Sequence, residues 1–156
     1  RLIRALNQTT RFAALPLAGT DGDLTANAVQ TWQSGVPYPT SYANGTIDFD
    51  PHRHSAARII QTGELDALLW IASLGALDAP QIEHVPTVVL GRADAKPQRE
   101  PEVFIPVATP GIDAAGHLLR TDKVITLHLA RLRESGLPAV ATVVEAIERQ
   151  LTEVAC

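Results

Sequence analysis

The histidines are one group of side chains in this 156-residue sequence that could bind a metal ion or take part in catalysis. His52 and His54 are separated by one residue, and two imidazoles at that spacing on a strand can bind Zn²⁺. Here the pair follows Asp50-Pro51, which predicts a helix start with Asp50 as the N-cap and Pro51 as the first helical residue. The other histidines have no carboxylate paired with them at ligand spacing: His84, His117 and His128. We therefore expect no metal site in this chain.

A glycine-bearing turn is the second candidate site. Residues 18–23 follow an apolar segment and precede a helix predicted over 24–33. Free N–H groups and the dipole at a helix N-terminus can bind an anion. The spacing of Gly19 and Gly22 fits neither the dinucleotide-binding nor the phosphate-loop motif, and two aspartates in the turn would repel phosphate. A plain connection between a strand and a helix is the competing interpretation.

A long connection, residues 34–50, is richer in aromatic side chains than the rest of the chain. Connections of this length are unusual in compact domains and are often functional. Tyr38, Tyr42 and Phe49 suit a subunit interface, where aromatic residues are enriched. The alternative is that these side chains only attach the loop to its own domain.

Apolar runs predict the elements that would position these residues. Residues 67–73 form an almost wholly apolar run between turn-forming residues, which is typical of a strand buried on both faces. We place this strand in the middle of a parallel sheet, preceded by a helix at 54–62 that ends at Gly63. Further strands are predicted at 11–17, 87–91 and 102–107, and a two-turn helix at 78–84. The pattern indicates an α/β fold with an open, mainly parallel sheet of Rossmann-like or flavodoxin-like type.

The carboxyl ends of such strands form the usual ligand-binding crevice. Beyond the sheet, two apolar runs predict a β-hairpin over 111–128, and spaced apolar residues predict an amphipathic helix over 138–155. Residues 1–156 are read as one domain, with an α/β core over 1–110. Residues 1–6 look like the last turns of a helix, so we expect further residues upstream.

Composition excludes several functions. The net charge of −4 and the lack of clustered Lys and Arg disfavour nucleic acid and anionic membrane surfaces as partners. A single cysteine, Cys156, cannot form an intrachain disulfide, which favours the cytoplasm. No Ser-His-Asp, paired-carboxylate or phosphate-loop constellation has convincing spacing, so we expect no catalytic residue in this chain.

Several segments, in order and spacing, carry a resemblance to a known family. They include VQTWQSGVP at 29–37, GELDALLWIA at 63–72 and VFIPVATPGI at 103–112, with shorter matches at 7–17, 49–51, 116–124 and 132–138. Together they resemble the C-terminal portion of the B subunit of formylmethanofuran dehydrogenase, a molybdopterin oxidoreductase. In that family a bis-pterin guanine dinucleotide holds molybdenum or tungsten. The resemblance implies that Gly19, Thr20, Asp21, Ser73 and Gly75 would line the site of one nucleotide arm.

The sequence also departs from that family. The family's iron–sulfur cysteines and metal-ligating cysteine or selenocysteine have no counterpart here. The chain looks like the shortened form of this protein in the formyltransferase/hydrolase complex of methylotrophic bacteria. That resemblance implies a structural subunit without its own cofactor, next to an amidohydrolase-like A subunit that holds zinc, a C subunit and a formyltransferase-like D subunit. Such a complex transfers formyl from tetrahydromethanopterin to methanofuran and hydrolyses formylmethanofuran to formate. The alternatives are a fragment of a molybdenum or tungsten dehydrogenase and a free-standing nucleotide-binding module.

Overall fold

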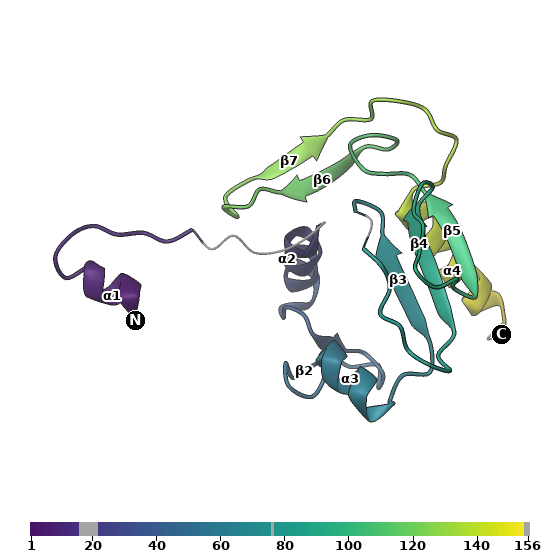
Figure 1. Ribbon diagram of the computed structural model, residues 1–156, viewed down its shortest axis with the longest axis horizontal. Coiled ribbons are helices and arrows are strands. Elements are labelled where there is room, and N and C mark those ends of the chain that lie inside the picture. The colour runs from purple at the N-terminus through teal and green to yellow at the C-terminus, as the bar shows by residue number, and fades with distance from the viewer. Residues whose placement is uncertain (16–21, 76, 155–156) are drawn as a thin grey trace.

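The computed structural model describes residues 1–15, 22–75 and 77–154. A parallel sheet forms its centre, with a helix behind it, a hairpin above it and a helical lobe beside it (Figure 1). The helices are α1 (Leu2–Leu6), α2 (Asp23–Ser34), α3 (Ala56–Thr62) and α4 (Val140–Val154). The strands are β1 (Thr40–Ser41), β2 (Asp48–Phe49), β3 (Leu68–Ala72), β4 (Thr87–Arg92), β5 (Val103–Val107), β6 (Gly116–Leu119) and β7 (Thr126–Leu129). The predicted α/β class, the C-terminal hairpin and the C-terminal helix are confirmed.

The central sheet has the order β3-β4-β5, and all its neighbouring strands are parallel. The middle strand is therefore β4, and the prediction that placed residues 67–73 in the middle is wrong. Burial explains the error: Leu69 and Ile71 are each 48% exposed, whereas Leu90 on β4 is 0% exposed. An apolar run also fits an edge strand with one uncovered face, so composition alone did not separate the two cases.

The connections between the strands differ from a doubly wound fold. Among the described residues, neither the β3–β4 nor the β4–β5 connection contains a helix, so the predicted helix at 78–84 is absent. Instead, the first connection runs back over the sheet, where Trp70 Nε1 donates a hydrogen bond to the carbonyl oxygen of Leu77 at 2.9 Å. The Rossmann-like or flavodoxin-like detail is therefore not confirmed.

The predicted strand at 11–17 is also absent over its described part, residues 11–15. Here the amide of Asn7 takes the place of a strand partner. Its Oδ1 accepts from the Phe12 N–H at 3.0 Å, and its Nδ2 donates to the Phe12 carbonyl at 2.7 Å. Residues 1–15 project away from the rest of the molecule (Figure 1).

Helix α3 ends at Gly63 as predicted, because that residue adopts the left-handed conformation with φ of 68°. Its predicted start at residue 54 is two residues too early, because α3 begins at Ala56. The N-cap is Ser55, while Asp50 Oδ1 accepts hydrogen bonds from the N–H groups of His52 and Arg53, both at 2.9 Å. Asp50 thus caps a separate turn before the helix, so His52 and His54 precede α3.

The buried core lies where the middle of the sheet meets the segment after β5. In the part of the chain that the structure describes, the buried apolar side chains are those of Val89, Leu90, Val107 and Ala108. The Ala108 N–H donates to the Pro138 carbonyl at 2.8 Å, which brings the start of α4 to this core. The end of α4 extends beyond it, since Leu151 is exposed.

Candidate functional site: an uncharged aromatic surface

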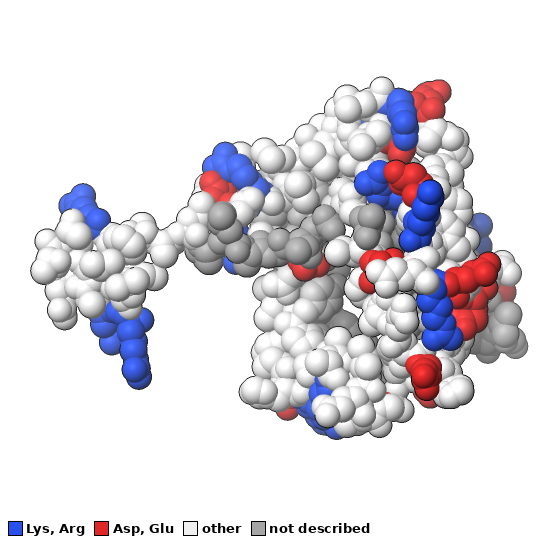
Figure 2. Space-filling model, in the orientation of Figure 1, with Lys and Arg blue, Asp and Glu red and all other residues white. Residues whose placement is uncertain are grey.

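Helix α2 and the loop after it form an uncharged surface. Residues 24–47 contain no Asp, Glu, Lys, Arg or His. In Figure 2 the lobe of α2, β2 and α3 is mostly white, whereas charged side chains gather over the sheet and its connections. Trp32 is 69% exposed, and Tyr38, Tyr42 and Phe49 are 54%, 50% and 41% exposed. The set of these four exposed residues, Trp32 on α2 and the other three on the loop after it, is named the aromatic surface below.

Two side chains of α2 hold the loop that carries the tyrosines. Asn27 Oδ1 accepts from the Tyr38 N–H at 2.8 Å, and Gln30 Nε2 donates to the Tyr42 hydroxyl. These amides lie three residues apart, on one side of the helix. Thr40 and Phe49 pair in the short antiparallel ladder of β1 and β2. The loop is therefore ordered while its aromatic rings remain accessible.

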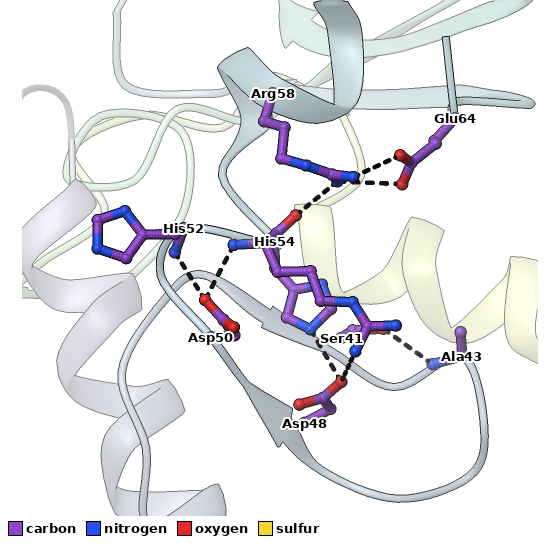
Figure 3. A network of polar contacts seen from close by, with 9 residues as sticks. Ser41, Ala43, Asp48, Asp50, His52, His54, Arg58 and Glu64 are labelled. Carbon is purple, nitrogen blue, oxygen red and sulfur yellow. Dashed lines mark hydrogen bonds and ion pairs between the residues drawn. The ribbon is translucent and has the colours of Figure 1, made fainter. Parts of the chain in front are cut away.

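A polar network joins this loop to α3 (Figure 3). Asp48 Oδ2 lies 3.0 Å from His54 Nε2, without hydrogen-bond alignment, and 3.5 Å from Arg53 Nη1. Arg58 donates to the Arg53 carbonyl at 2.9 Å and forms a bidentate pair with Glu64 at 2.8 and 3.2 Å. That pair holds the pKa of the Glu64 carboxyl below its ordinary value. The network fixes the loop on α3 and contains no nucleophile aligned with His54.

The carboxyl ends of the sheet strands contain part of the predicted nucleotide site. Gly75 lines a cavity of about 450 Å³, measured with its open mouth, together with Gly91, Lys96 and Phe104. Ser73 is not among its lining residues. The other residues predicted for this site, Gly19, Thr20 and Asp21, lie outside the described residues.

Two arginines near these strand ends are paired with carboxylates. Arg92 forms a bidentate pair with Asp94 at 2.6 and 2.9 Å, which lowers the pKa of Asp94. Arg133 Nε lies 2.6 Å from Oδ1 of the buried Asp113, whose Oδ2 accepts from the Thr109 N–H at 3.2 Å. Both guanidinium groups are thus already neutralised, which disfavours their use for a pyrophosphate.

The Asp113–Arg133 pair should make stability depend on pH. The pKa of Asp113 is lowered below its ordinary value, mainly by the hydrogen bond from Arg133 and also by the hydrogen bond from the Thr109 N–H. Burial of the carboxyl raises the pKa, but by less than these two contacts lower it. A lowered folded pKa means that the pair stabilises the fold above the unfolded value of about 3.9. This stabilisation is lost as the pH falls through the lower, folded pKa.

We expect Arg133→Gln to lower the stability of the fold near pH 7, where the Asp113 carboxylate then keeps only the Thr109 N–H, and we expect the difference from the wild type to shrink as the pH falls and Asp113 is protonated. Urea unfolding midpoints between about pH 3 and pH 7 measure this difference. Arg131→Gln is the matched control, since it breaks the exposed pair with Glu134. Equal pH profiles for the two variants would contradict the role given to Asp113.

Within the described ranges, no three His, Cys, Asp or Glu side chains gather as a metal-binding group. In the same part of the chain, no helix has both the length and the hydropathy needed to cross a bilayer.

Comparison with known proteins identifies the class to which this fold belongs. No family model matches the chain. A chain in the crystal structure of the formyltransferase/hydrolase complex FhcABCD from Methylorubrum extorquens, in complex with methylofuran, matches 99% of this chain with a TM-score of 0.83 and 29% identity. The match covers 44% of that chain. The fold is therefore that of one part of a subunit of this complex.

Sequence comparison agrees. The B subunit of the Fhc formyltransferase/hydrolase complex of Methylorubrum extorquens is 35% identical over 119 residues, which are 75% of this chain and 33% of the relative. The B subunit of tungsten-containing formylmethanofuran dehydrogenase 2 of Methanocaldococcus jannaschii is 29% identical over 129 residues, which are 80% of this chain and 30% of the relative. The chain is a homologue of the formylmethanofuran dehydrogenase B subunits, including that of the Fhc complex. It spans about a third of the length of these relatives.

Proposed function

We propose that this chain is a structural part of the B subunit in a cytoplasmic formyltransferase/hydrolase complex. The complex would transfer formyl from tetrahydromethanopterin to methanofuran and hydrolyse formylmethanofuran to formate, with its zinc in the amidohydrolase-like A subunit. The observation that carries this proposal is the match to a chain of FhcABCD over 99% of the residues, together with 35% identity to the B subunit of Fhc.

The aromatic surface is where we propose that a sister subunit binds, whether the A, the C or the D subunit. Interface cores are depleted of charged residues and enriched in Tyr, Trp and Phe. Residues 24–47 have that composition, and the Trp32, Tyr38, Tyr42 and Phe49 side chains are all exposed. Their exposure argues against the alternative that the aromatic rings only attach the loop to its own domain.

The second candidate function is the pterin-binding part of a tungsten or molybdenum dehydrogenase. The similarity to the B subunit of a tungsten-containing enzyme favours it. The cofactor's nucleotide arm carries a pyrophosphate, which requires free cations or N–H donors. Arg92 and Arg133 do not supply free cations for it, because they are paired with Asp94 and Asp113.

Affinity purification of the tagged protein from its native cells tests the proposed function. We expect the A, C and D sister subunits in stable association, and formyl transfer and formylmethanofuran hydrolysis in the purified assembly. Recovery of the protein alone, as a stable monomer without either activity in associated proteins, would contradict the proposal and favour a free-standing binding module.

A further inference from the structure

We propose that His117 and His128 form a two-histidine binding site for a divalent transition metal. His117 lies on β6 and His128 on β7, and the two residues are direct partners in the antiparallel ladder. Their ring centroids are 5.3 Å apart, with an angle of 60° between the ring planes. The inference is independent of the proposed function, because it rests on this hairpin alone.

The hydrogen-bond pattern of the hairpin brings these side chains together. The Arg120 N–H donates to the Ile125 carbonyl at 2.9 Å, so that pair is hydrogen-bonded. Since hydrogen-bonded and non-hydrogen-bonded pairs alternate along an antiparallel ladder, His117 and His128 form a non-hydrogen-bonded pair. Such pairs have the shorter Cα separation and the closer side chains.

The contact of β6 with α2 supports this assignment. Leu119 is also in a non-hydrogen-bonded position, so its N–H points away from β7. It donates to Thr25 Oγ1 of α2 at 2.8 Å. The helix therefore holds β6 from the side opposite β7, which fixes the strand that carries His117.

The ring separation matches what one metal ion would require. With metal–nitrogen bonds of about 2.0–2.1 Å and tetrahedral coordination, two imidazole centroids lie roughly 5 Å apart. Both histidines are exposed, so an ion can reach them and water can fill its remaining positions. An ion bound across the strands would stabilise a two-stranded hairpin, which is only marginally stable by itself.

The donor set selects the class of metal. Neutral imidazoles favour Zn²⁺, Ni²⁺ and Cu²⁺ over Mg²⁺ and Ca²⁺. Among the described residues no third ligand of the His, Cys, Asp or Glu type completes a group. We therefore expect reversible binding that follows the order Cu²⁺ above Ni²⁺ above Co²⁺, with Zn²⁺ below Cu²⁺.

Calorimetric titration of the full chain, purified without a histidine tag, tests the site. We expect one Ni²⁺ or Zn²⁺ per chain, and loss of that binding in both His117→Gln and His128→Gln. The matched control is His52→Gln, which removes an exposed histidine outside the hairpin and should leave the titration unchanged. Binding that persists in both hairpin variants, or no binding by the wild-type chain, would overturn the proposal.

Amide hydrogen exchange of the wild-type chain provides a measurement that does not depend on variants. At free metal ten times above the dissociation constant, local opening that requires metal release should slow about tenfold. We expect this slowing at the Leu118 and Leu127 amides, which belong to the next hydrogen-bonded pair. Unchanged exchange at both amides on metal addition would contradict the site and would mean that the two rings contact each other without binding a metal ion.

Discussion

Leu90→Ala should destabilise the chain by about 2–5 kcal/mol, as expected for a leucine deleted from a packed core. Leu90 lies on the middle strand β4, pairs with Ile71 and Ile105, and is 0% exposed. The substitution removes apolar burial and leaves a cavity that the sheet cannot fill without moving its strands. Urea unfolding of the full chain measures the loss of unfolding free energy.

Leu69→Ala on β3 is the matched control for Leu90→Ala. The same side chain is shortened in the same sheet, but Leu69 is 48% exposed at an edge strand. We expect its cost in the chain alone to be well below that of Leu90→Ala. Equal losses at the two positions would mean that β3 is as buried as β4, as its apolar sequence suggests.

Trp32→Ala should weaken assembly with the sister subunits by about 2–4 kcal/mol, or roughly 30- to 700-fold in the dissociation constant. Trp32 is the most exposed residue of the aromatic surface, at 69%, so it makes few contacts within its own chain. Tryptophan and tyrosine are frequent hot spots at interfaces. Quantitative binding of the variant to the other subunits, with its unfolding midpoint measured in parallel, tests this expectation.

Tyr42→Ala should act in the same direction, because Tyr42 is another exposed aromatic residue of the uncharged segment 24–47. Leu132→Ala is the control, since Leu132 is a large exposed apolar residue outside the aromatic surface. We expect it to leave both assembly and stability nearly unchanged. If Trp32→Ala lowered the stability of the isolated chain but its folded fraction still bound the sister subunits normally, the role proposed for this surface would be contradicted.

Local patterns predicted local structure well. Spaced apolar residues marked α4, a glycine marked the end of α3, and apolar runs marked β3, β4 and β5. Which strand lies in the middle depends on pairing between distant residues, such as Trp70 with Val89 and Val89 with Phe104. No local pattern in the sequence contains that information.

The errors at segment ends have a similar origin. Asp50-Pro51 has the chemistry of a helix start, but its N-cap hydrogen bonds serve a separate turn before Ser55. Residues 11–15 have strand-like composition, but the backbone of Phe12 pairs with the side chain of Asn7 instead of another strand. In each case a competing hydrogen-bond partner decided the conformation.

The candidate site was predictable only in part. Tyr38, Tyr42 and Phe49 were singled out from the sequence, and they prove to be exposed. Trp32 was missed as a surface residue, although the absence of charge over residues 24–47 is a signal that could have drawn attention to it. The contact between His117 and His128 follows from the register of the hairpin, which the apolar runs that predicted the hairpin do not specify.

Elemental analysis of the native assembly purified with this chain tests the proposed function most directly. A structural subunit of a formyltransferase/hydrolase complex predicts zinc from the amidohydrolase-like subunit and neither tungsten nor molybdenum. Stoichiometric tungsten or molybdenum would contradict the account, because the assembly would then be a formylmethanofuran dehydrogenase with a redox cofactor.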